Sequence, residues 1–174
     1  MEEARTAGEN EFPLSDDDKR TLLRLARASL EASVRKGRFD PDGIKAIPST
    51  PSLDRKAGAF VTLKCTTGSD GRCSGRGGEL RGCIGTLEPS APVYEVVARR
   101  AASAALEDTR FSPVTVAELP LIAVEISVLT PPRPVKSADE IVMGRHGIIL
   151  ESGWHGATFL PQVAHLMLRD RVSA

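Results

Sequence analysis

The sequence lacks an excess of charge of either sign and lacks a long apolar run. Lysine plus arginine and aspartate plus glutamate both number 23, so the formal net charge is zero. A neutral chain creates no broad field that attracts nucleic acid or an anionic membrane, and neither is an expected partner. The most apolar stretch, LPLIAVEISVL, is interrupted by Glu125 and is shorter than the roughly 20 residues that span a bilayer. These absences predict a soluble protein.

Cysteine is also scarce. Cys65, Cys73 and Cys83 match neither the paired cysteines of a disulfide framework nor the Cys-x-x-Cys spacing of zinc and redox sites. The simplest prediction is three free thiols in a reducing compartment. The first residues, MEEARTAGENEFPLSDDD, have neither the basic start nor the apolar stretch of a secretory signal. We therefore expect a cytoplasmic protein in which residues 1–14 form a disordered acidic tail.

Motifs that name a reaction are missing. The sequence has no Ser-His-Asp signature, phosphate loop, dinucleotide-binding glycine fingerprint or His-x-x-x-His helix. No feature calls for a metal or an organic cofactor.

Hydrophobic spacing and breaker residues outline one domain. Ser15, with Asp18 three residues later, predicts the capped start of an amphipathic helix that stops at Gly37. A second, alanine-rich helix is expected from Ser90 or Pro92 to Asp108. The predicted strands cover residues 58–65, 80–86, 121–130, 147–152 and 157–161, and a final short helix begins near Pro161. Because hairpins replace regular strand-helix-strand alternation, the predicted class is α+β with a mainly antiparallel sheet.

The stretch LRGCIGT, residues 80–86, is the most unusual. Two glycines in a strand, Gly82 and Gly85, indicate that a ligand or another backbone comes close. Period-two alternation sends Leu80 and Ile84 to the core and Arg81 and Cys83 to the other face, where the guanidinium would favour a thiolate. In the alternative interpretation Cys83 is a small buried residue, Arg81 is a surface charge or a structural ion-pair partner, and the glycines only allow a helix to pack closely.

A reactive Cys83 thiol would need a base or another polar side chain beside it, and several residues are candidates. His146 and His155 lie at the edges of the last predicted hairpin and His165 follows it, and turn histidines are usually solvated rather than catalytic. The stretch EDTRFSPVT brings Asp108, Arg110 and Phe111 together after a helix, either as a cleft lining or as an ordinary helix end. Gln162 either presents its amide to a ligand or simply begins the last helix.

Several motifs together resemble one family. GAFVTL, LRGCIGTLEP, DTRFSPVTVAEL, EISVLTPP, GRHGIIL and FLPQVA follow the order of the AMMECR-type domain, whose bacterial members are called AmmeMemoRadiSam system protein A. The resemblance runs from about Phe12 to Ala164 and assigns residues 15–174 to this domain. It implies a five-stranded, largely antiparallel sheet packed with helices, a smaller subdomain, and a cleft that includes LRGCIG.

The same resemblance implies partners and site residues. The partners are a Memo-type protein and a radical S-adenosylmethionine (radical SAM) protein of the same system. The family motifs fall on catalytic candidates Cys83, Arg81 and Asp108, with His146 at a variable position. They also fall on binding candidates Gly82, Gly85, Thr86, Arg110, Phe111 and Gln162. Two departures are a glycine-rich insertion at 66–79 and the absence of the family's usual C-terminal tail, as in a truncated copy.

Three functions are compatible with this pattern. The first is a binding or accessory subunit that holds a small molecule, a peptide or a partner protein. The second is an enzyme that uses Cys83, activated by Arg81 and assisted by Asp108 or a histidine. The third is a purely structural role for the motif, and sequence alone leaves open whether the protein is an enzyme.

Overall fold

The computed structural model describes residues 14–66, 78–130, 132–142, 146–152 and 155–159. The chain divides into two compact units, Met1–Pro131 and Pro132–Ala174. The first contains helices α1 (Asp16–Lys36) and α2 (Val93–Leu106), short 3₁₀ helices η1 (Pro41–Ile44) and η2 (Val116–Leu121), and strands β1 (Gly58–Cys65), β2 (Leu80–Thr86) and β3 (Ile122–Leu129). The second contains η3 (Ala138–Glu140), β4 (Ile148–Ser152) and β5 (His155–Phe159).

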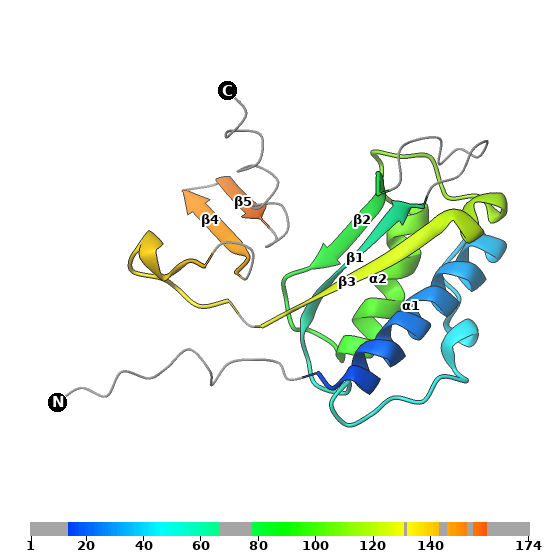
Figure 1. Cartoon of the computed structure of the whole chain (residues 1–174), viewed down its shortest axis with the longest axis horizontal. Helices are drawn as coiled ribbons and strands as arrows, with labels where there is room; N and C mark the ends of the chain where they lie inside the picture. The colour runs from blue at the N-terminus through cyan, green and yellow to red at the C-terminus, as the bar shows by residue number, and fades with distance from the viewer. Residues whose placement is uncertain (1–13, 67–77, 131, 143–145, 153–154, 160–174) are drawn as a thin grey trace. The chain divides into compact units, whose positions relative to one another are not determined.

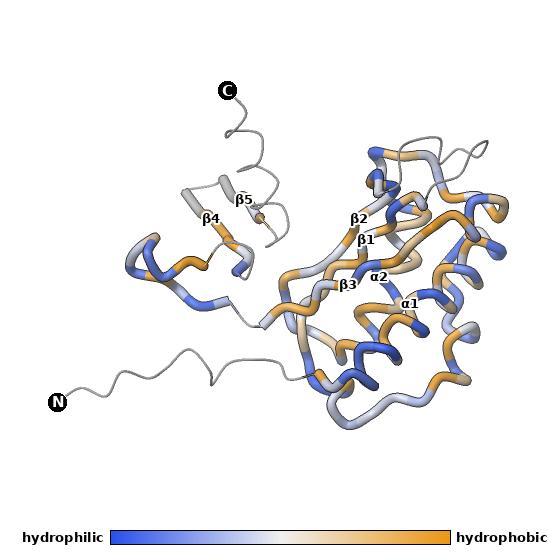
Figure 2. The backbone as a smooth tube through the Cα atoms, in the orientation of Figure 1, coloured by the Kyte–Doolittle hydropathy of each residue, from blue (hydrophilic) through white to orange (hydrophobic). Residues whose placement is uncertain are grey.

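The ends of α1 confirm the predicted caps. The Ser15 hydroxyl accepts a hydrogen bond from the Asp18 amide at 3.1 Å, and the Asp18 carboxylate accepts one from the Ser15 amide at 3.0 Å. These two bonds satisfy backbone groups that a helix N-terminus otherwise leaves free. Gly37 ends the helix in a left-handed conformation with φ of 68°. Hydrophobic and hydrophilic residues alternate along the helix at helical spacing (Figure 2).

The three strands of the first unit form an antiparallel sheet in the order β2-β1-β3. In β1 and β2, Thr62 lies opposite Cys83 and Phe60 lies opposite Gly85. The register of this pair shifts between Leu63 and Lys64, so β2 contains an irregularity near its start. Both β2 and β3 are edge strands, with β1 between them.

Both helices cover the same face of this sheet (Figure 1). Val61 and Leu63 on β1 are fully buried together with Leu30 of α1 and Val97 of α2. Small residues on α2 allow the helices to approach closely, and the Ser29 hydroxyl donates a 2.7 Å hydrogen bond to the Ala98 carbonyl oxygen. The core therefore lies between one sheet face and the helix pair, as the alanine-rich pattern of α2 predicts.

The predicted single five-stranded sheet is wrong. Strands β4 and β5 pair only with each other, in a separate two-stranded antiparallel sheet. Prolines follow β3 and end it, because proline has no amide hydrogen to donate to a neighbouring strand. The α+β class is correct, with helices, a three-stranded sheet and a two-stranded sheet.

Some predictions fall outside the described residues. They include most of the acidic tail, residues 67–77 of the glycine-rich insertion, and the helix expected near Pro161. None of the helices in the described residues has the length and apolar character needed to cross a membrane.

The prediction of three free thiols is wrong for Cys65, which forms a disulfide. Cys65 ends β1 where the hairpin closes: its carbonyl accepts from the Gly78 amide, and its own amide donates to the Glu79 carbonyl. The spacing rules for local cysteine motifs do not detect this bond. Cys83 carries a free thiol.

Candidate functional site

The two glycines of LRGCIGT are explained by contacts within the protein. A Cβ atom built on Gly82 would lie 2.2 Å from the carbonyl oxygen of Ala104 in α2. A Cβ atom on Gly85 would lie 2.2 Å from the ring of Phe60, the residue paired with Gly85 on β1. Gly82 thus lets the backbone of α2 approach the sheet, and Gly85 leaves room for an aromatic ring. The close approach predicted from the sequence is real, and protein atoms supply it.

Arg81 does not follow the predicted alternation. The register shift places it at the irregular start of β2, where it is 6% exposed, whereas Leu80, predicted to lie in the core, is 41% exposed. The Arg81 guanidinium donates hydrogen bonds of 2.9 and 3.3 Å to the two carboxylate oxygens of Glu118. An extra residue in one strand breaks period-two alternation and reorients the side chains beside it. The guanidinium therefore serves a buried ion pair.

Glu118 is the partner that sequence reasoning did not identify. It is only 2% exposed, and its carboxylate also accepts 2.8 Å hydrogen bonds from the Thr115 amide and hydroxyl. Burial by itself raises the pKa of Glu118, but the hydrogen bonds from Arg81 and Thr115 outweigh burial and hold the pKa below its usual range. The Thr-x-x-Glu spacing is a capping-box signal, but it does not reveal which arginine will reach the carboxylate.

Asp108 and Arg110 clamp the backbone of Cys83 at the sheet edge. The Cys83 amide donates a 2.8 Å hydrogen bond to the Asp108 carboxylate, and the Cys83 carbonyl oxygen accepts a 3.2 Å bond from Arg110. The two side chains also bond each other, with distances of 2.7 and 2.9 Å. An edge strand leaves such backbone groups unpaired, and here side chains from the segment after α2 satisfy them. The predicted Asp108–Arg110 cluster therefore does meet Cys83.

The charges of this clamp stabilise one another. Hydrogen bonding from Arg110, reinforced by the Cys83 and Arg110 amides, lowers the pKa of Asp108 to about 2 against the opposing effect of burial. The same contact raises the pKa of Arg110. The Asp108 side chain is 4% exposed, whereas the Arg110 side chain is 55% exposed and its guanidinium lies 5.5 Å from the centre of the Phe111 ring. Asp108 is a fixed anion, and Arg110 presents a cation to solvent.

The thiol of Cys83 contacts the strand beside it. Its sulfur lies 3.3 Å from the Thr62 hydroxyl, which belongs to the residue directly opposite on β1. Thr62 alternates with Val61 and Leu63, so the sequence pattern of β1 is sufficient to place it on the face away from the helices. We call the group formed by Thr62, Cys83, Asp108, Arg110 and Phe111 the Cys83 site.

Comparison with known proteins shows the family of the chain. The AMMECR1 family model matches residues 23–171. The chain belongs to the AMMECR1 family. A Methanothermobacter thermautotrophicus protein is 40% identical over 159 residues, which cover 87% of this chain and 75% of that protein. A Thermococcus gammatolerans protein is 39% identical over 158 residues, covering 87% and 72%.

The fold of this AMMECR1 family chain also matches a solved structure. The crystal structure of an uncharacterised Pyrococcus horikoshii protein has a TM-score of 0.73 and 35% identity, covering 86% of this chain and 72% of that one. The family resemblance carried by the sequence motifs is therefore confirmed.

Other predicted site residues of the AMMECR1 family chain are distributed differently. Thr86 lies at the end of β2, where its hydroxyl accepts a 3.3 Å hydrogen bond from the Glu88 amide. His146 belongs to the second unit, and its Nδ1 accepts a 3.0 Å hydrogen bond from the Val142 amide. His155 begins β5, and Gln162 and His165 lie outside the described residues. Among the described residues, no three histidine, cysteine or acidic side chains converge as a metal site would require.

Proposed function

We propose that this AMMECR1 family protein is a binding or accessory subunit and that the Cys83 site contacts its partner. The observation that supports this is the clamp, in which Asp108 is fixed on the Cys83 backbone while the Arg110 guanidinium remains half exposed beside a free thiol. An exposed, positioned arginine next to an aromatic ring suits recognition of a carboxylate or a peptide carbonyl.

The same geometry disfavours the cysteine-enzyme alternative. A nucleophilic thiol needs a nearby base to take its proton. Asp108, with a pKa of about 2, is too weak a base for this at neutral pH. Arg81 is engaged by the Glu118 carboxylate and is therefore not free to stabilise a thiolate. Binding does not require a proton acceptor beside the thiol.

The partners to test follow from the family resemblance. They are the Memo-type protein and the radical SAM protein of the same system. A short peptide or a small molecule with a carboxylate is the corresponding ligand class. Each proposed protein partner presents backbone carbonyls and carboxylates, which are the groups that Arg110 recognises best.

The experiment measures affinity of the purified full chain for each of these two proteins. Arg110→Gln should weaken binding about tenfold, because the exposed cation is lost, and Cys83→Ser should change it less than threefold. Arg20→Gln is the matched control, since Arg20 also pairs with an aspartate at 2.8 Å but lies on α1, away from the Cys83 site. Thermal unfolding of each variant separates lost binding from lost folding.

Two results would overturn the proposal. One is the absence of binding to both proteins by a folded wild-type chain. The other is a turnover that Cys83→Ser abolishes, because this outcome identifies the cysteine enzyme instead.

A further inference from the structure

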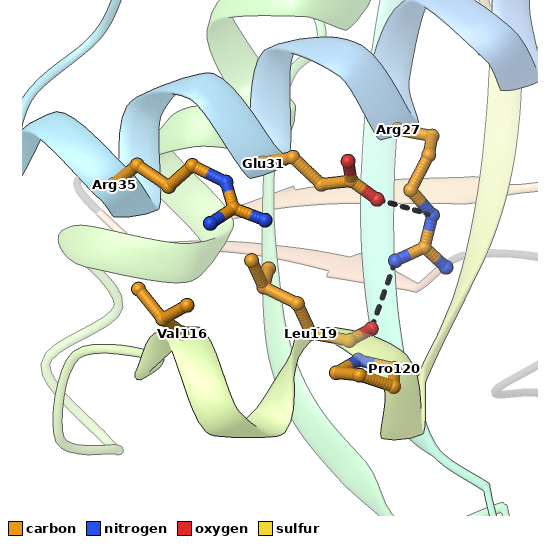
Figure 3. Close-up of a pocket in the computed structure, with 6 residues that line it drawn as sticks. All are labelled: Arg27, Glu31, Arg35, Val116, Leu119 and Pro120. Carbon is orange, nitrogen blue, oxygen red and sulfur yellow. Dashed lines mark hydrogen bonds and ion pairs between the residues drawn. The ribbon is translucent and has the colours of Figure 1, made fainter.

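A concave surface lies away from the Cys83 site. Six residues of α1 and η2 line a groove of about 350 Å³, namely Arg27, Glu31, Arg35, Val116, Leu119 and Pro120 (Figure 3). Helix α1 packs against β3, whereas Cys83 lies on β2, and these two strands form opposite edges of the sheet. The groove is therefore separate from the proposed partner contact at Cys83.

The walls of the groove are fixed by Arg27. Its guanidinium donates a 3.1 Å hydrogen bond to the Leu119 carbonyl oxygen and another to the Ile122 carbonyl oxygen. These bonds tie α1 to the C-terminal part of η2 and to the residue that follows it, and so hold the two walls of the groove together. A preorganised surface avoids part of the ordering cost that opposes association.

Arg35 is a charged residue of the groove that these contacts do not neutralise. Glu31 precedes it by four residues, which is a favourable spacing for an ion pair on a helix. The Glu31 carboxylate instead lies 3.9 Å from Arg27, and Figure 3 shows it directed toward that side chain. Arg35 makes no ion pair or hydrogen bond with any residue in the described part of the chain. Its guanidinium extends toward the groove above Val116 and Leu119 (Figure 3).

The floor of the groove is apolar and partly open. Val116 is 48% exposed and Pro120 is also exposed, although both are apolar residues of η2. A volume of about 350 Å³ is at the lower end of the range for small-molecule pockets, which usually enclose most of their ligand. An open groove of this size fits a few side chains of a larger partner better than a whole enclosed ligand.

We infer that the groove between α1 and η2 binds a short segment of a partner protein that carries an acidic side chain beside an aliphatic one. The carboxylate pairs with Arg35, and the aliphatic side chain covers the exposed Val116 and Pro120. Charge complementarity favours the acidic residue, because the Glu31 carboxylate faces Arg27 and leaves Arg35 without an acidic partner among the described residues. The exposed apolar floor of the groove favours an aliphatic residue beside that acidic residue.

The experiment begins with selection of a random peptide library on the immobilised full chain. Selected peptides should combine acidic and aliphatic residues, and their affinity should fall as salt increases. Arg35→Glu should weaken binding of a selected peptide about tenfold, and Val116→Asp should weaken it by a similar factor. Both positions are exposed, so both variants should fold. Arg24→Glu is the matched control, a charge reversal on the same helix outside the groove, and should change affinity less than twofold.

Three outcomes would overturn the inference. In the first, selection yields peptides without acidic residues. In the second, Arg35→Glu binds the selected peptide as tightly as wild type does. In the third, light scattering shows a wild-type dimer that Arg35→Glu converts to a monomer, because the occupant would then be a second copy of this chain.

Discussion

Replacement of Gly82 by alanine tests the packing of β2 against α2 most directly. The added Cβ would meet the Ala104 carbonyl oxygen at 2.2 Å, more than 1 Å inside an ordinary contact of about 3.4 Å. Because the atom it meets belongs to the helix backbone, the strand and the helix must separate. Overpacking of this kind costs about 3 kcal/mol. Alanine recovers up to about 1 kcal/mol by restricting the unfolded chain, which leaves a net loss of about 2 kcal/mol.

Urea unfolding measures this loss. With an m-value of about 2 kcal/mol/M, the transition midpoint of Gly82→Ala should fall by about 1 M. The matched variant is Gly85→Ala, whose Cβ meets the Phe60 ring at the same 2.2 Å distance. A ring can rotate or be truncated, so Gly85→Ala should be tolerated in a Phe60→Ala background. No side-chain truncation should rescue Gly82→Ala.

A small change in stability would refute this prediction. If Gly82→Ala unfolds within 0.5 kcal/mol (~0.25 M urea) of wild type, the close contact with α2 does not constrain the strand. A ligand contact would then become the better explanation of this glycine.

Two further predictions concern the buried charges. Glu118→Ala should lower the free energy of unfolding by about 3 to 5 kcal/mol, because it leaves the Arg81 guanidinium buried without its acid, and the double variant Arg81→Met/Glu118→Leu should recover most of that loss in urea unfolding. An equally unstable double variant would contradict this explanation. The folded-state pKa of Asp108, about 2, lies below the unfolded value of about 3.9, so its clamp contributes about 2 kcal/mol that is present above pH ~4 and lost as pH falls toward 2. Asp108→Asn should remove that pH dependence, and an unchanged acid transition would count against the clamp.

Local patterns in the sequence were sufficient for the helices and strands. The predicted strands 58–65 and 80–86 have the same bounds as β1 and β2, because each is a short apolar run next to a glycine-rich stretch. The Ser15–Asp18 box and Gly37 define the ends of α1 for the same reason, because capping depends on residues only a few positions apart. The motif order likewise carried the family resemblance.

The arrangement of the strands in sheets needed the tertiary structure. Five correctly typed strands were expected in one sheet, yet β4 and β5 pair only with each other. Strand pairing is a contact between distant residues, and local periodicity does not specify which edges meet.

The candidate site was likewise determined in part by the sequence and in part by the tertiary structure. The sequence by itself determined that LRGCIGT is a strand with unusually close neighbours, and it brought Asp108, Arg110 and Phe111 forward as a cluster. Only the tertiary structure decided that Ala104 and Phe60 are those neighbours and that Arg81 pairs with Glu118 rather than with the thiol. It also decided that Asp108 and Arg110 bind the Cys83 backbone. One extra residue in β2 is enough to redirect Arg81, and the carboxylate that receives it lies 37 positions further along the chain, beyond the reach of any local pattern.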